Sequence, residues 1–151
     1  MTSSVERALR EVATTTLEEL AFLFPLDAQE SAGHNAPVDA VASVSFRGPF
    51  EGRLVLRISG NLLVTIADNM FGDDELHPEY HQRDALGELA NVICGNVLPS
   101  IGGANAVFVL DAPQVSLLEL PTADVPLART CIALEEGHAE LLLFLKGALP
   151  S

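Results

Sequence analysis

Two segments with the same strand-turn-strand pattern constrain the fold of this chain more than any other feature. Residues 38–46 place Val, Ala and Phe at every second position, residues 47–50 supply turn chemistry, and residues 52–58 return with a second alternating run. Residues 129–134 and 139–146 repeat this arrangement about a turn at 135–138. A two-residue period around a glycine-containing turn is typical of an antiparallel hairpin. The pattern therefore predicts two hairpins, and their weak similarity leaves a duplicated unit as one alternative.

Helical patterns alternate with these hairpins. The first helix is predicted from Ser3 or Ser4 to about Phe24, a second over 61–70, and a third from Pro78 to Pro99. Residues 27–37 have loop composition, and residues 106–110 and 114–120 are strand-like. Mixed helices and hairpins predict an α+β fold with a largely antiparallel sheet. No linker divides the chain, so we expect a single domain over residues 1–151.

Composition narrows the class of protein. The chain has 151 residues, 48% of them hydrophobic, which is enough for a buried core. Its formal net charge of -13 argues against nucleic acid or an anionic membrane as the main partner. Two cysteines do not make a disulfide framework, the first residues lack the apolar core of a signal peptide, and no apolar run is long enough to span a membrane. We expect a cytoplasmic protein.

The third helix carries the strongest functional signal, over residues 84–97. At about 100° per residue, one face collects apolar side chains, namely Leu86, Leu89, Ala90, Ile93 and Val97. The opposite face collects Asp84, Glu88, Asn91 and Gly95. Glu88 and Asn91 are three residues apart and can reach one ligand together. Gly95 costs the helix about 1 kcal/mol relative to alanine but would let another molecule approach closely. A solvated helix face with no function is the alternative interpretation, because exposed Glu and Asn are common.

The string Asp84-x-x-x-Glu88-x-x-Asn91, followed by Gly95-Asn96, resembles the signature of the CheC/CheX phosphatases. The hairpin before it, the helix ending Met70-Phe71-Gly72 and the closing strand from Gly137 resemble the same family. The CheC branch carries a second copy of the motif on its first helix. Here that helix reads Glu11-x-x-Thr14 and Glu18-x-x-Ala21, so the chain is more similar to the CheX branch. The resemblance implies a long sheet flanked by two long helices and, typically, a homodimer.

The resemblance also implies a substrate and roles for the four residues. The family dephosphorylates the phospho-aspartate of CheY-type response regulators, with the Mg²⁺ held by the receiver and no cofactor on the phosphatase. Asn91 would orient the attacking water, and Glu88 would pair with the receiver lysine, because a carboxylate beside a phosphoryl group needs a cation between them. Asp84 would contact the partner and Gly95 would give clearance. The rival hypothesis is a CheX-like domain that binds a response regulator or a flagellar-switch component without catalysis.

Other features favour structural interpretations. His77 and His81 have metal-compatible spacing but no third ligand. Cys94 and Cys131 lie in apolar segments and are predicted to be buried thiols. Gly102-Gly103 lacks the lysine of a phosphate-binding loop, and Asp73-Asp74-Glu75 is typical of a solvated turn. We therefore expect no metal or cofactor site of the protein's own.

Overall fold

The computed structural model describes residues 4–25, 38–59, 62–72, 79–116, 125–134 and 137–146. The elements follow the order α1 (Ser4–Ala21), β1 (Val38–Arg47), β2 (Gly52–Ser59), α2 (Leu62–Phe71), α3 (Glu79–Gly102), β3 (Val109–Leu110), β4 (Gln114–Ser116), β5 (Ala128–Leu134) and β6 (Gly137–Leu145). This confirms the predicted α+β class. No helix among the described residues is both long and apolar enough to cross a membrane.

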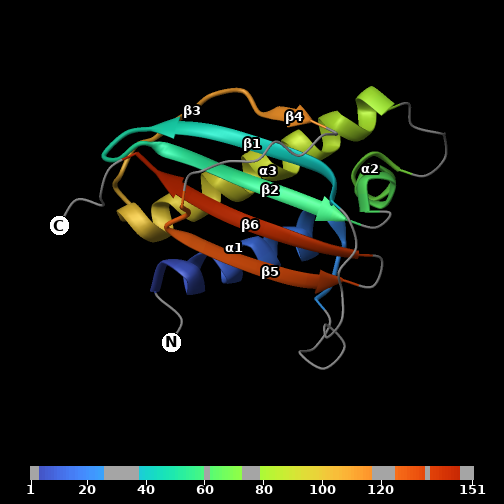
Figure 1. The fold of residues 1–151 in the computed structure, drawn as a ribbon, viewed down its shortest axis with the longest axis horizontal. Helices are drawn as coiled ribbons and strands as arrows, with labels where there is room; N and C mark the ends of the chain where they lie inside the picture. The colour runs from blue at the N-terminus through green and yellow to red at the C-terminus, as the bar shows by residue number, and fades with distance from the viewer. Residues whose placement is uncertain are drawn as a thin grey trace.

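The sheet is antiparallel and built around the two predicted hairpins. Its strand order is β3-β1-β2-β6-β5, with the short β4 also pairing with β1 (Figure 1). The β1–β2 and β5–β6 hairpins meet where β2 pairs with β6 over seven residue pairs, from Gly52↔Leu145 to Ile58↔Ala139. Both hairpins lie in one sheet, so their inward side chains form a continuous apolar surface.

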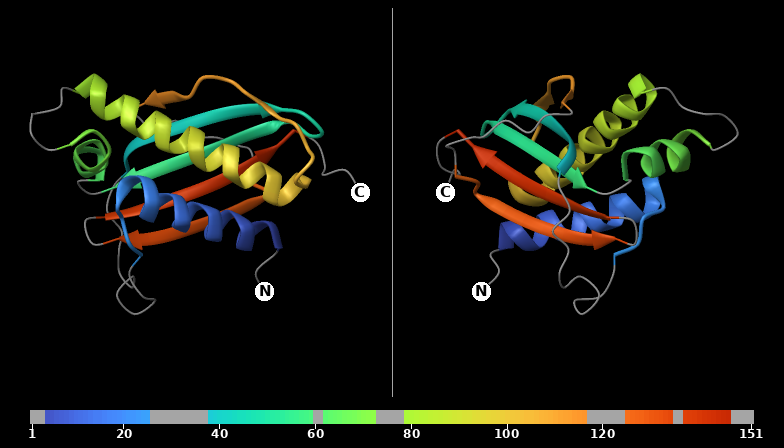
Figure 2. Two further views of the ribbon diagram at one scale, coloured as in Figure 1. Left: turned by 180° about the vertical axis from the view of Figure 1, so that it is seen from behind. Right: turned by 45° about the vertical axis from the view of Figure 1, so that its right-hand side comes forward.

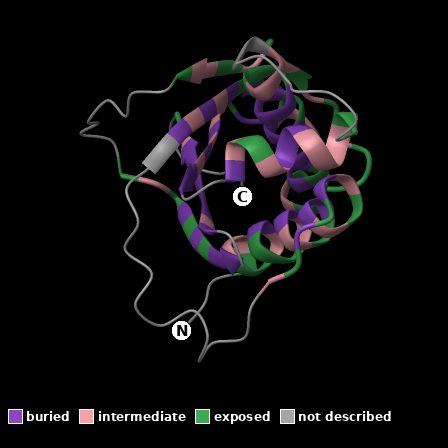
Figure 3. Ribbon diagram, turned by 90° about the vertical axis from the view of Figure 1, so that its right-hand side faces the viewer, coloured by how far each residue is buried: buried purple, intermediate pink, exposed green. Residues whose placement is uncertain are grey.

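Helices α1 and α3 lie across the same face of that sheet and run in opposite directions (Figure 2). Their inner sides meet the inner side of the sheet, and Figure 3 shows the buried residues gathered between the two layers. The core includes fully buried leucines and isoleucines from both layers: Leu9, Leu17, Leu54, Leu56, Leu86, Leu89, Ile93 and Ile132. Each such side chain contributes about 1.5–3 kcal/mol on burial. The core therefore fixes the orientation of α3, which carries the predicted site.

Two helix ends differ from the predictions. α1 ends at Ala21 rather than near Phe24, because Phe22 takes a positive φ of 55° and Leu23 N–H then bonds to Leu17 O at 2.9 Å. α3 continues past Pro99 to Gly102. Proline removes a hydrogen bond without ending this helix, which closes where Gly103 (φ 101°) donates its N–H to Pro99 O at 2.9 Å.

The strands on the outer side of β1 are shorter than predicted. The expected strand over 106–110 is reduced to Val109–Leu110, because only these residues pair with β1, at Arg47 and Phe46. The next strand is described over Gln114–Ser116, where it pairs with Val41–Ser43, and residues 117–120 of the prediction lie outside the described residues. The segment from 109 to 116 therefore follows β1 and passes beside α3.

Candidate functional site

The two faces of α3 are those predicted from its sequence. Leu86, Leu89, Ala90, Ile93 and Val97 are all buried, as are Ala85, Cys94 and Leu98 beside them. Asp84, Glu88 and Gly95 are exposed, and Asn91 is half-buried. With a rise of about 1.5 Å per residue, the outward row extends roughly 16 Å along the helix. Glu88 and Asn91 lie one turn apart at its centre, while Asp84 and Gly95 mark its two ends.

The polar side chains of this row have no partner within the described structure. No hydrogen bond or ion pair joins Asp84, Glu88 or Asn91 to any side chain or loop that the structure describes. Half-burial restricts Asn91 to fewer positions than a fully exposed side chain has. The row thus offers two carboxylates and one amide to an external molecule, on a helix held rigid by the core.

Gly95 gives the row an opening that packing does not require. A Cβ atom placed there would meet only Leu110 Cδ2, at 4.0 Å, so the neighbouring residues leave room for a larger side chain. Pro99 lies four residues later and has no N–H to donate to the Gly95 carbonyl. A glycine costs about 1 kcal/mol in a helix interior, and nothing in the internal packing offsets this. The opening is consistent with close approach by another molecule.

A wall from the 109–116 segment flanks the row on one side. A Cβ atom at Gly87, the residue before Glu88, would lie 3.2 Å from Pro113 Cγ and 3.4 Å from Val115 Cγ2. Farther along, Leu110 approaches Gly95. Neither Gly87 nor Pro113 belongs to the row predicted from the sequence. Pro113 lies far along the chain from Glu88, so no local pattern could show that they meet.

A groove of about 290 Å³ lies between α3 and α1. Its lining consists of Glu11, Val12, Thr15, Thr16, Glu19 and Asn96. The two carboxylates and Asn96, next to Gly95, make this side polar and negative. The outward row of α3 is therefore a ridge between an apolar wall and an acidic groove, a shape suited to a protein partner with a positively charged group.

The two cysteines occupy different environments, and one prediction about them was wrong. Cys94 is buried on α3, and burial raises the pKa of its thiol to about 12. Cys131 is exposed rather than buried. It lies on the edge strand β5, where alternation sends Thr130 and Ile132 inward and Cys131 to the open face. Partial burial and the nearby Glu140 carboxylate raise the Cys131 pKa, while Arg129 and Arg10 lower it.

The remaining sequence candidates add no site. His77 and Asp73-Asp74-Glu75 lie outside the described residues, and the half-buried His81 packs its ring edge-on to Phe71. Within the described part of the chain, no group of three His, Cys, Asp or Glu residues could hold a metal ion. Gly102 packs against Phe108 and Phe50 and Gly103 ends α3, so this pair closes a helix.

Fold and site together define a class: an antiparallel sheet, two long antiparallel helices on one face, and an acid-amide row on the second long helix. The family model for the chemotaxis phosphatase CheX matches residues 40–135. The chain therefore belongs to the CheX family. A comparison with curated proteins found no significant sequence match.

Solved structures show the same fold at low sequence identity. The CheX of Desulfovibrio desulfuricans has a TM-score of 0.74 and 18% identity, covering 95% of this chain and 100% of that one. A CheX-CheY-BeF3-Mg²⁺ complex from Borrelia burgdorferi gives 0.68 and 13%, covering 93% and 97%. FliY of Thermotoga maritima gives 0.59 and 17%, covering 96% and 91%.

Proposed function

We propose that this chain hydrolyses the phospho-aspartate of a CheY-type response regulator, using the outward row of α3. The observation that carries the proposal is the pairing of Glu88 with Asn91 on a rigid helix, beside an opening at Gly95. Membership of the chemotaxis phosphatase family supports the reaction, and the CheX-CheY complex among the similar folds supports the partner.

Asn91 is proposed as the catalytic residue. Its amide oxygen would accept a hydrogen bond from a water and hold that water in line with the phosphorus. The water oxygen forms a bond to phosphorus as the bond to the aspartyl oxygen breaks. The electron pair leaves with the aspartate carboxylate, and the proton of the water goes to the released phosphate. Positioning suffices for this reaction, because an acyl phosphate already has a good leaving group.

Glu88 is proposed to dock the receiver. Its carboxylate would form an ion pair with the receiver lysine rather than act as a base, because the phosphoryl group repels a bare carboxylate. Asp84 would contact the partner at the start of the row, and the bare backbone at Gly95 would admit it at the other end. The Mg²⁺ belongs to the receiver and neutralises phosphoryl charge there. The chain itself needs no cofactor in this mechanism.

The decisive experiment measures phosphate release from a phosphorylated CheY-type receiver with Mg²⁺, comparing the unmodified protein with Asn91→Ala. Acceleration by the unmodified protein alone supports the proposal. Binding without acceleration, across several receivers, would replace it with the adaptor function. The homodimer and the cytoplasmic location stay predictions from the family resemblance and the sequence. Sedimentation velocity tests the first, and fractionation of cells expressing the protein tests the second.

A further inference from the structure

The open face of the sheet differs in charge from the helices. Among side chains that the structure describes, α1–α3 carry three arginines and seven carboxylates, whereas the strands and the residues joining them carry five cations and three carboxylates. The five cations are Arg47, Arg53, Arg57, Arg129 and Lys146. Glu140 is buried between Arg57 and Arg129 and neutralises part of that charge. A chain with a net charge of -13 therefore gathers most of its cations on the sheet.

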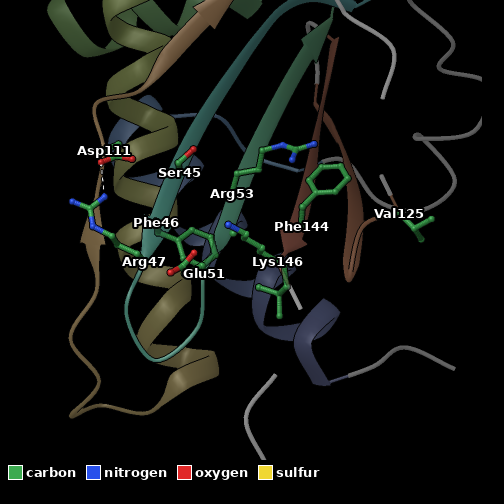
Figure 4. A pocket seen from close by; sticks show the side chains of 11 residues that line it. Ser45, Phe46, Arg47, Glu51, Arg53, Asp111, Val125, Phe144 and Lys146 are labelled. Carbon is green, nitrogen blue, oxygen red and sulfur yellow. Dashed lines mark hydrogen bonds and ion pairs between the residues drawn. The ribbon is translucent and has the colours of Figure 1, made fainter. Parts of the chain in front are cut away.

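A cavity of about 560 Å³ opens at one end of this face (Figure 4). Its floor is one row of cross-strand neighbours, because Ser45 pairs with Arg53 and Arg53 with Phe144. The salt bridge between Arg47 Nη1 and Asp111 Oδ1, 3.0 Å long, lines one side. The other lining residues are Phe46, Glu51, Gly52, Val125, Leu145 and Lys146. Three cations thus meet two carboxylates around one cavity.

Two of these cations are held in position. The Arg53 guanidinium lies 4.2 Å above the centre of the Phe144 ring, and Phe144 is only 5% exposed. Such stacking fixes the guanidinium plane, whose fork of N–H donors matches carboxylate and phosphate oxygens. An exposed ion pair with Asp111 orients Arg47 at the side of the cavity. Groups fixed in advance lose little conformational freedom when they bind a ligand. Val125, 86% exposed, adds an apolar surface to the same cavity.

We propose that this cavity binds a small organic anion, one phosphate or carboxylate group joined to an apolar body. The anionic oxygens would contact Arg53 and Lys146, and the apolar part would lie against Val125. A volume of 560 Å³ falls within the range of about 300–1,000 Å³ typical of small-molecule sites. The helices cover the other face of the sheet (Figure 2), and the cavity lies on the face away from α3 (Figure 4), so this proposal does not depend on the proposed phosphatase function.

Calorimetric titration at low ionic strength tests the proposal with AMP, benzoate, adenosine and inorganic phosphate as probes. We expect saturable binding of AMP or benzoate at one site per chain, and at least tenfold weaker binding of adenosine and inorganic phosphate. Lys146→Gln should weaken the binding of the anionic probe at least fivefold. Arg7→Gln removes the same charge from the exposed side of α1 and should change the binding constant less than twofold.

Several results would overturn the proposal. The first is that neither organic anion binds saturably, and the second is that inorganic phosphate binds as tightly as the organic anions. The third is that Arg7→Gln weakens binding as much as Lys146→Gln does, which would show a response to net charge alone. A second copy covering the cavity would also prevent binding, and sedimentation of the same samples would reveal it. Arg53→Gln gives a second loss of binding, but it also uncovers Phe144. Thermal melting must therefore confirm that it folds, and the exposed Lys146 carries the test if it does not.

Discussion

Helices α1 and α3 share much of their burial pattern but differ in chemistry. Residues 9–21 of α1 correspond one by one to residues 86–98 of α3. Both stretches bury their first, fifth, eighth, ninth and last positions and expose the third and eleventh. Each helix precedes one of the two hairpins along the chain. The glutamates Glu11 and Glu88 occupy the same position, exposed on both helices. The two helices thus share part of their packing pattern, and a glutamate on an outward helix face does not by itself make a site.

Three of the positions at which the two helices differ bear directly on the site. Thr14 stands where α3 has Asn91, and Glu18 stands where α3 has Gly95. Arg10 replaces the buried Gly87, and its Nη1 donates to Thr130 Oγ1 (3.2 Å) and Cys131 O (3.0 Å) on β5. α1 is therefore anchored by a long side chain where α3 has bare backbone beneath Pro113. The amide and the opening on α3 are the features that a catalytic role requires, and each can be exchanged or removed.

Asn91→Ala should have the largest effect. If its amide positions the water, turnover of the phosphorylated receiver falls about 100-fold or more, because misplacing a reacting group costs on that order. The measurement is phosphate release under single-turnover conditions. The matched control is Thr14→Ala at the corresponding position of α1, which should keep full activity. Equal losses in the two variants would mean that the helices do not differ in function, and full activity of Asn91→Ala would exclude the proposed mechanism.

Glu88→Lys should weaken receiver binding by about tenfold or more, because like charges facing each other across an interface cost several kcal/mol. Glu11→Lys makes the same change on α1 and should alter the dissociation constant less than about threefold. Surface plasmon resonance with an immobilised receiver measures both, and the loss for Glu88→Lys should shrink as salt is raised. If Glu11→Lys weakens binding as much as Glu88→Lys, the receiver docks across both helices rather than on α3.

The sequence predicts the two faces of α3 and both hairpins, but it does not predict the contacts between distant segments. The buried stripe of α3 and its outward row follow from helical periodicity, and both hairpins follow from alternation around a turn. Contacts between distant segments left no local signal, so the approach of Pro113 to Gly87 was missed. The sequence predicts that α3 ends at Pro99, but the helix continues to Gly102 because a core that holds Leu98 outweighs one lost hydrogen bond. Apolar neighbours hid the exposure of Cys131, which depends on which face of an edge strand is uncovered.

Cys94 makes the stability of the protein depend on pH, whereas Leu17, at the corresponding position of α1, has no ionisable group. The Cys94 pKa of about 12 is above the value of 9.0 for an unperturbed thiol, so the folded state holds the proton longer than the unfolded chain. Its contribution to stability is complete below pH 9 and decreases by about 1.4 kcal/mol per pH unit above it, until the folded pKa is reached. Urea unfolding from pH 8 to 11 should show the difference between the unmodified protein and Cys94→Ala narrowing with pH. Cys131→Ala removes the exposed thiol, and the free energy of unfolding of this variant should still decline steeply as pH rises. If the difference in the free energy of unfolding between the unmodified protein and Cys94→Ala stays constant with pH, the Cys94 thiol has the same pKa in the folded and unfolded chains.

Gly95→Ala should have the smallest effect, and the direction in which it changes stability and receiver affinity is what tests the comparison. Replacing a helix-interior glycine should raise the free energy of unfolding by about 0.5–1 kcal/mol, because the added Cβ meets only Leu110, at 4.0 Å. If the opening serves the receiver, the same variant should bind it more weakly, and Gly95→Glu, which installs the residue of α1 at this position, more weakly still. Chemical unfolding and the receiver-binding assay measure the two effects on the same samples. A variant that gains stability and keeps full affinity would show that Gly95 has no part in docking. Opposite changes in the two quantities would show that stability is given up at this position for access, the property that separates α3 from α1.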